Sequence, residues 1–198
     1  MIAIVDYRAG NLTSVKKAFD HVGADSFVTS DPEAIGKASK VVLPGVGHFA
    51  ATKVLETSGM RGAIAEAIKR EVPFLGICVG MQWLFETSEE SLETLGLGLF
   101  PGQCEHFPLA VKSPHVGWND LTRQTPSLLL AAIPQSSFVY FTHTYRAPVG
   151  PGSVAQCEYG GTFSAAVERG RVFGVQFHPE KSGEVGLTIL RNFCNLPC

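Results

Sequence analysis

The sequence predicts a single α/β domain whose central, mostly parallel sheet is flanked by helices and extended by antiparallel strands in the second half. From residue 2 to about residue 90, short apolar runs alternate with segments of helical periodicity. After Glu90, glycine and proline separate a series of short strand-like runs. The 198 residues, of which 45% are hydrophobic and 17% charged, suit one domain with a full core. No linker divides residues 1–198.

The elements of the first half follow from apolar runs and capping residues. Asn11 and Asp31 are helix-capping types, and Pro32 suits a first helical position. Strands are expected over 2–5, 26–29, 40–43 and 74–77, and helices over 12–22, from 32, and over 50–70 with a break at 58–59. Alternation of this kind predicts parallel strands, whose ligand sites lie beyond their carboxyl ends.

The second half predicts further strands over 138–145, 154–159, 163–168 and 172–177, joined by glycine turns such as Gly160-Gly161. We expect these strands to be mostly antiparallel and to extend the central sheet. A closing helix is expected over 184–194, where Leu187, Leu190 and Phe193 supply an apolar side.

Charge and composition argue against several classes of protein. The net charge of −2 offers no basic field for nucleic acid, and no apolar run approaches the roughly 20 residues of a membrane span. The N-terminus lacks the basic region of a signal peptide. The cysteines show no metal-binding spacing, which favours reduced thiols in the cytoplasm and no metal site. They stand at positions 78, 104, 157, 194 and 198.

Cys78 lies at a predicted strand-to-helix corner between Gly76 and Gly80. A corner of this kind exposes the side chain and holds its backbone tightly. The amide groups that begin the next helix, which carries Met81, Leu84 and Phe85 on one side, would favour the thiolate. A lone cysteine in an apolar run is more often a packed structural residue. The flanking glycines favour a nucleophile, because a packed thiol needs no such corner.

A base for this nucleophile is predicted at the end of the last apolar strand. His178 follows the run 172–177, which delivers it to the sheet edge that carries Cys78. Pro179 stiffens the backbone, so Glu180 can orient the imidazole. The alternative is a surface loop with an unrelated histidine and glutamate. Together with Cys78, the pattern favours a Cys78–His178–Glu180 triad.

The loop Pro44-Gly45-Val46-Gly47 follows another predicted strand at the same edge. Its two glycines allow exposed backbone amides, which can bind the oxyanion of a tetrahedral intermediate. The amide of Val79 would be the second donor. A phosphate-binding loop is the competing interpretation, but no Lys-Ser or Lys-Thr pair follows.

These motifs resemble the triad (class I) glutamine amidotransferases, through Gly76-Ile-Cys78-Val-Gly80-Met-Gln82 and Phe177-His178-Pro-Glu180. Further segments resemble the glutaminase subunits of imidazole glycerol phosphate synthase, over essentially the whole chain. They are 44–49, 115–119, 140–145 and 177–182. The resemblance implies the flavodoxin-like fold of that family.

The resemblance also implies a role for individual residues. Cys78 would be the nucleophile, His178 the general base and acid, and Glu180 its orienting group. The amides of Val46, after a peptide flip, and Val79 would form the oxyanion hole. Glutamine would be held by Gly47, Gln82, Glu90, Thr144 and Tyr145. The partner would be faced by Trp118, Tyr140 and Lys181. Val79 and Val116 depart from the more usual Leu and Met.

The implied reaction is hydrolysis of glutamine to glutamate and ammonia, with no metal or organic cofactor. The ammonia would pass to a (β/α)8-barrel synthase subunit, which forms imidazole glycerol phosphate and AICAR in histidine biosynthesis. Alternatives are the glutaminase of another amidotransferase, a non-catalytic scaffold that binds a partner, and a stand-alone cysteine hydrolase. Gln82 and Lys181-Ser182 argue against the glutaminase of pyridoxal phosphate synthase. Roles for His48, His115 and His143 stay open.

Overall fold

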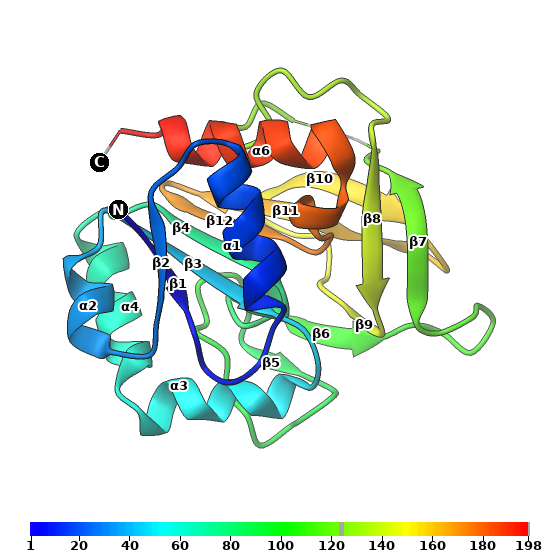
Figure 1. Cartoon of the computed structure of the whole chain (residues 1–198). Coiled ribbons are helices and arrows are strands. Elements are labelled where there is room, and N and C mark those ends of the chain that lie inside the picture. Colours follow the sequence, from blue (N-terminus) through cyan, green and yellow to red (C-terminus); the bar gives the residue numbers. More distant parts are fainter. Residues whose placement is uncertain (123–124, 198) are drawn as a thin grey trace.

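The expected strands of the first half form the parallel centre of a seven-stranded sheet in the computed structural model, which describes residues 1–122 and 125–197 (Figure 1). Cys198 lies outside the described residues. The parallel strands are β1 (Ile2–Val5), β2 (Ser26–Thr29), β3 (Lys40–Gly45), β4 (Phe74–Cys78) and β12 (Val172–Val175). The antiparallel β11 (Thr162–Arg169) and β10 (Ser153–Glu158) extend the sheet, in the order β10-β11-β12-β4-β3-β1-β2. Every residue of β1, β3, β4 and β12 is buried, as the continuous apolar runs predict.

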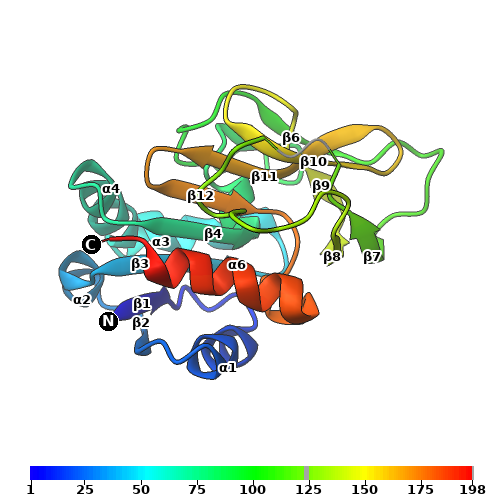
Figure 2. The same cartoon turned by 90° about the horizontal axis from the view of Figure 1, so that it is seen from above.

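Helices cover both faces of this sheet. On one face lie α1 (Leu12–His21) and α6 (Gly183–Asn195), and on the other lie α2 (Pro32–Lys37), α3 (Lys53–Thr57) and α4 (Met60–Lys69) (Figures 1 and 2). The predicted caps are confirmed: Asn11 accepts a hydrogen bond from the Ser14 amide, and Asp31 accepts one from the Glu33 amide. Two 3₁₀ turns, η1 (Phe49–Thr52) and η2 (Pro179–Lys181), precede α3 and α6.

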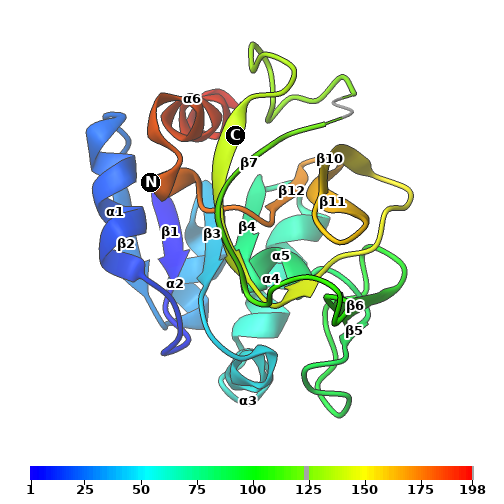
Figure 3. The ribbon, with the colours of Figure 1, turned by 90° about the vertical axis from the view of Figure 1, so that its right-hand side faces the viewer.

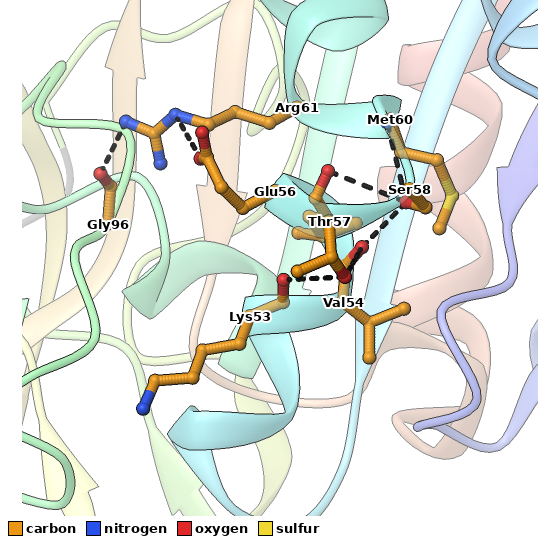
Figure 4. A network of polar contacts seen from close by, with 9 residues as sticks. Lys53, Val54, Glu56, Thr57, Ser58, Met60, Arg61 and Gly96 are labelled. Atoms are coloured by element: carbon orange, nitrogen blue, oxygen red, sulfur yellow. Dashed lines mark hydrogen bonds and ion pairs between the residues drawn. The ribbon is translucent and has the colours of Figure 1, made fainter.

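The predicted break near Ser58-Gly59 separates α3 from α4 (Figure 4). Gly59 adopts a left-handed φ of 79°, and the Ser58 hydroxyl donates to the Val54 carbonyl, which ends α3. Arg61 pairs with Glu56 across the break and donates to the Gly96 carbonyl at 2.9 Å. The corner between the two helices is thereby tied to the loop that follows the Cys78 region.

The second half differs from the expectation that all its strands extend the central sheet. A two-stranded sheet is made by β7 (His115–Asp120) and β8 (Phe138–His143), and a three-stranded sheet by β5 (Thr87–Ser88), β6 (Gln103–His106) and β9 (Tyr145–Arg146). The expected strand 138–145 is therefore wrong as one unit, since Thr144 divides it. Alternation of burial along a strand shows that one face is covered, but not which sheet the strand joins.

The helix after Cys78 is also shorter than predicted. α5 (Val79–Gln82) is a single turn, so Leu84 and Phe85 lie beyond it. The amides of Leu84 and Phe85 donate only three residues back, to Met81 and Gln82, and the amides of Leu97 and Leu99 in the next loop donate to the carbonyls of Trp83 and Leu84. These carbonyls would otherwise accept the bonds of a continuing helix. With one turn only, α5 presents its first amides beside Cys78 but has no long helix dipole.

The corner depends on close contact between backbones. A Cβ added to Gly76 would lie 2.4 Å from the Gly80 carbonyl oxygen, and one added to Gly80 would lie 1.9 Å from the Leu43 carbonyl oxygen. Only glycine allows β3, β4 and α5 to approach so closely.

Gly80→Ala should therefore destabilise the protein by about 3 kcal/mol or more, because Leu43 meets the new methyl group with rigid backbone. Gly62→Ala is the matched control in α4, where a Cβ meets nothing within 4 Å. It should stabilise by about 0.5–1 kcal/mol. Denaturant unfolding of both variants measures the difference, and equal stabilities would contradict the packing described here.

Candidate active site

The register of the parallel strands brings the predicted site residues to one edge. Gly45 at the end of β3 pairs with Cys78 at the end of β4, and Val175 at the end of β12 pairs with Ile77. The chain then continues from β12 to His178. The β7–β8 sheet lies across these carboxyl ends (Figure 3). Three separate segments therefore surround the Cys78 side chain.

Cys78 has φ 54° and ψ −108°, a conformation that L-residues rarely adopt. The corner holds it there through the glycine contacts described above. Its Sγ atom lies 3.7 Å from Nε2 of Gln176 and 3.9 Å from the Thr142 carbonyl oxygen. The thiol is thus directed by β8 and by the segment after β12, and it forms part of the wall of a pocket.

His178 and Glu180 form a buried pair. Their side chains are 2% and 1% exposed, and Nδ1 of His178 lies 2.8 Å from Oε1 of Glu180. Nε2 of His178 is buried and has no hydrogen-bond partner of ordinary geometry. Burial by itself lowers the pKa of His178, but hydrogen bonding to Cys78 and Glu180, together with their charges, outweighs it and raises the pKa to about 10. The arrangement favours the protonated imidazolium form of His178.

The backbone of His178 is fixed by β8. Its amide donates to the Tyr140 carbonyl at 2.9 Å. The Ser182 hydroxyl donates to the His178 carbonyl at 2.7 Å and accepts from the Tyr140 amide at 3.0 Å. With Pro179 between His178 and Glu180, the ring has little freedom.

Val46 and Val79 lie on either side of Cys78. Gly45, next to Val46, packs so tightly on α5 that a Cβ there would lie 2.8 Å from the Val79 Cβ and 2.4 Å from the Tyr7 hydroxyl. Gly47 has a left-handed φ of 108°. The residues whose amides are predicted to hold an oxyanion, Val46 and Val79, therefore directly follow the paired positions Gly45 and Cys78.

A pocket of about 310 Å³ opens at the sulfur. The predicted binding residues Gly47, Gln82, Glu90, Thr144 and Tyr145 all line it, together with Cys78 and Val79. Val46, His178 and Glu180 stand outside this lining. Sequence reasoning did not predict the further lining residues Pro114, Thr142 and His143.

Two hydrogen bonds fix the segment that follows the Pro44–Gly47 loop. The Glu90 carboxylate accepts a hydrogen bond from the Phe49 amide at 2.6 Å. His48, whose role the sequence left open, is exposed and caps η1, because its Nδ1 accepts from the Ala50 amide at 3.1 Å. His48 is therefore a structural residue of the segment after the Pro44–Gly47 loop.

His143, which lines the pocket, forms a buried pair with His115. Nδ1 of His143 lies 2.8 Å from the Tyr145 carbonyl oxygen, and its Nε2 lies 3.2 Å from Nδ1 of His115. Burial lowers the pKa of His143 to about 3 and that of His115 to about 4. Both rings are neutral near pH 7. The carbonyl then requires the proton of His143 on Nδ1, so its Nε2 accepts from His115.

Gln176 is a polar residue of the site that sequence reasoning missed. It is fully buried, donates to Cys78 Sγ, and accepts from Nε2 of Gln82 at 3.2 Å. The signal was present, since Gln176 interrupts the otherwise apolar run that ends at Phe177. An amide in such a run needs a buried hydrogen-bond partner.

Of the predicted partner-facing residues, Trp118 and Tyr140 lie on the β7–β8 sheet, and Lys181 lies beside it in η2. Trp118, 54% exposed, pairs with Tyr140 across the strands, and their rings lie 6.1 Å apart. Nζ of Lys181 lies 5.7 Å from the centre of the Tyr140 ring. Val116 and Phe138 on the same two strands are more than half exposed. This apolar face, called the β7–β8 face below, has the composition of an interaction surface.

Over 1–122 and 125–197, no group of three or more His, Cys, Asp and Glu residues is arranged to hold a metal ion. Within the same ranges no helix has the length and apolar character needed to cross a membrane.

Comparisons with known proteins agree on one family. The sequence model described as glutamine amidotransferase class-I matches residues 3–196. The chain is 46% identical to the imidazole glycerol phosphate synthase subunit HisH of Moorella thermoacetica, covering 98% of this chain and 94% of the relative. It is 44% identical to the subunit of that name from Methanothermobacter thermautotrophicus, covering 99% and 98%.

Solved structures agree on the fold. A crystal structure of a glutamine amidotransferase superposes with a TM-score of 0.76 at 18% identity, covering 98% of this chain and 97% of that chain. A chain of the PurLQS structure from Thermotoga maritima gives a TM-score of 0.75 at 20% identity, with the same coverage of 98% and 97%. The predicted fold class is confirmed.

The neutral histidine pair should make stability depend on pH. Because the folded-state pKa of His143 lies below its unfolded value of about 6.5, the unfolded state binds more protons, and stability falls as pH drops from about 6.5 toward 3. His178 has a raised pKa, so its contribution to the free energy of unfolding is fully present below about pH 6.5. It therefore does not change with pH in this range. His143→Gln should reduce the slope of unfolding free energy between pH 6 and 4.5 by up to about 1.4 kcal/mol per unit.

Exposed His21, at the end of α1, provides the control for this experiment. His21→Gln should leave the slope unchanged. An unchanged slope in His143→Gln would show that this ring is not held neutral by its burial.

Proposed function

Because the chain belongs to the class-I glutamine amidotransferases, and among them to the glutaminase subunits of imidazole glycerol phosphate synthase, we propose that it hydrolyses glutamine and delivers ammonia to a synthase subunit. The whole chain acts as one glutaminase domain. The observation that carries the proposal is the buried Cys78–His178–Glu180 arrangement beside a polar pocket.

In the proposed first half-reaction, the Cys78 thiolate attacks the side-chain amide carbon of glutamine. The oxygen of the tetrahedral intermediate accepts hydrogen bonds from the amides of Val46 and Val79. The His178 imidazolium transfers its proton to the leaving nitrogen, so ammonia departs and a glutamyl thioester remains on Cys78. Glu180 stabilises the imidazolium and fixes its tautomer through the contact at Nδ1.

In the second half-reaction, neutral His178 removes a proton from water, which attacks the thioester carbon. Collapse of the second tetrahedral intermediate releases glutamate and restores the thiolate beside the imidazolium. Burial of both Cys78 and His178 supports this cycle, because a desolvated thiolate and imidazolium interact strongly.

The pocket supports glutamine as the substrate. Its volume of about 310 Å³ suits an amino acid, and its lining combines the Glu90 carboxylate with backbone and side-chain polar groups of Gln82, Thr144 and Tyr145. The Glu90 carboxylate can pair with the ammonium group of the substrate. Gly47 has no side chain, so its backbone is accessible to the substrate. These residues are proposed to bind the substrate and to place its amide at Cys78.

The partner is proposed to be a (β/α)8-barrel synthase in the cytoplasm, which docks on the β7–β8 face as a heterodimer. Ammonia would pass directly into it and be used to form imidazole glycerol phosphate and AICAR. Trp118, Tyr140 and Lys181 support this assignment, since they present an exposed aromatic pair and a cation on one face. The chemistry proposed for the subunit itself needs only its own side chains and water.

Replacement of Cys78 tests the activity. Cys78→Ser should abolish glutamate release by the complex while leaving its ammonia-dependent synthesis intact. Glu180→Gln should lower kcat by about 10²–10⁴-fold, because the imidazolium loses its stabilising charge. Cys157→Ser, which replaces a buried cysteine of β10, is the control and should retain activity. Glutamate and product are measured with glutamine or ammonium as nitrogen source, and glutaminase activity in Cys78→Ser would refute the mechanism.

The same assay compares the chain with and without its partner. Two glycines flank Val46, which allows its amide to turn away from the sulfur. Loss of one oxyanion donor costs about 2.7–4 kcal/mol in activation free energy, so the free chain should be about 10²–10³-fold slower. Full glutaminase activity of the isolated chain would contradict this switch.

Trp118→Ala tests the docking face. Removal of a central exposed aromatic side chain should weaken partner binding by about 2 kcal/mol, or roughly 30-fold in Kd. Leu92→Ala is the control, because Leu92 is 67% exposed but lies outside the β7–β8 sheet. Titration calorimetry with the purified synthase measures both. Equal affinities for the two variants would place the interface elsewhere.

A further inference from the structure

A chain of side-chain amides connects the pocket wall to the sulfur of Cys78. Nε2 of Gln82 donates to the Tyr145 carbonyl at 2.8 Å and to Oε1 of Gln176 at 3.2 Å. Nε2 of Gln176 then lies 3.7 Å from Cys78 Sγ. Gln82 is 2% exposed and Gln176 is fully buried, so water does not compete for these bonds.

The direction of this chain is fixed by a group that cannot be reversed. A backbone carbonyl only accepts hydrogen bonds, so Gln82 must present its NH2 group to Tyr145. The same NH2 group faces Gln176, which must therefore present its oxygen. The other end of the Gln176 amide, which faces the sulfur, is then necessarily an N–H donor. Rotation of either amide by 180° would leave two like groups facing each other in a buried place.

An N–H donor at this position favours the thiolate over the thiol. A thiolate is a good acceptor, whereas the sulfur of a thiol accepts only weakly, and hydrogen bonds to charged groups are the stronger class. The Gln176 amide also restricts the rotation of the Cys78 side chain.

We propose that Gln176 is a positioning residue that donates a hydrogen bond to the Cys78 thiolate, and that Gln82 and the Tyr145 carbonyl hold it in the donating orientation. The role in glutamine hydrolysis rests on the function proposed above, whereas the effect on the thiol does not. Gln82 would thus serve both substrate and nucleophile.

The test is the pH dependence of Cys78 alkylation by iodoacetamide in the isolated full-length chain, followed by peptide mass spectrometry. Gln176→Leu should move the midpoint of the alkylation rate upward by about one pH unit or more, the equivalent of one hydrogen bond to a charged group. Gln82→Leu should move it in the same direction by less, because Gln176 keeps its N–H but loses its orientation. The double variant should shift no further than Gln176→Leu.

Val175→Ala is the control for a purely structural effect. Val175 is fully buried and precedes Gln176, so its truncation lowers stability without touching the sulfur. Its alkylation midpoint should equal that of the unmodified sequence. Gln82→Leu serves as the test if Gln176→Leu does not fold.

Unchanged midpoints in folded Gln176→Leu and Gln82→Leu, or an equal shift in Val175→Ala, would overturn the proposal. The experiment uses neither glutamine nor a partner, so it is separate from the glutaminase assay. In that assay Gln176→Leu should lower kcat with little change in KM, since Gln176 does not line the pocket. A lower kcat together with a clearly higher KM would assign Gln176 to substrate binding instead.

Discussion

The alignment of three parallel strand ends is the constraint on which the site depends. β3, β4 and β12 are in register at their carboxyl ends, so Val46, Cys78 and His178 reach one edge although they are far apart in the sequence. The register holds only while the backbones approach at Gly76 and Gly80. The stability of the sheet and the geometry of Cys78 therefore depend on the same contacts.

The Tyr145 carbonyl has a second organising effect. It lies at hydrogen-bond distance from both Nε2 of Gln82 and Nδ1 of His143. One acceptor thereby sets the direction of two buried networks, one that ends at Cys78 and one that ends in the His143–His115 pair. These hydrogen bonds explain how Gln82, Gln176, His143 and His115 are accommodated inside an apolar core.

Much of the fold and of the candidate site could be predicted from local signals. Continuous apolar runs identified the parallel strands, and glycines around Cys78 identified the corner. The length of α5 could not be predicted, because a later loop occupies the carbonyls of Trp83 and Leu84, just beyond the helix, through the amides of Leu97 and Leu99.

Other features escaped prediction because they depend on which strands pair. The separate β7–β8 sheet is one, since alternation along β8 fits either sheet. Gln176 is another: its importance comes from Gln82 and Cys78, which lie at its side only after β4 and β12 pair. Long-range pairing therefore accounts for most of what local patterns missed.

β8 has a consequence for how this sequence can vary. Val139, Phe141 and His143 are buried, whereas Phe138 and Tyr140 belong to the outer face, so both sides of the strand have assigned contacts. Deletion of one residue in β8 would exchange the two sets and would separate His178 from the Tyr140 carbonyl. A substitution in β8 affects only the inner or only the outer face and can be tolerated, whereas a change in the length of the strand affects both faces. Length variation among relatives should therefore be confined to the loops that flank β8.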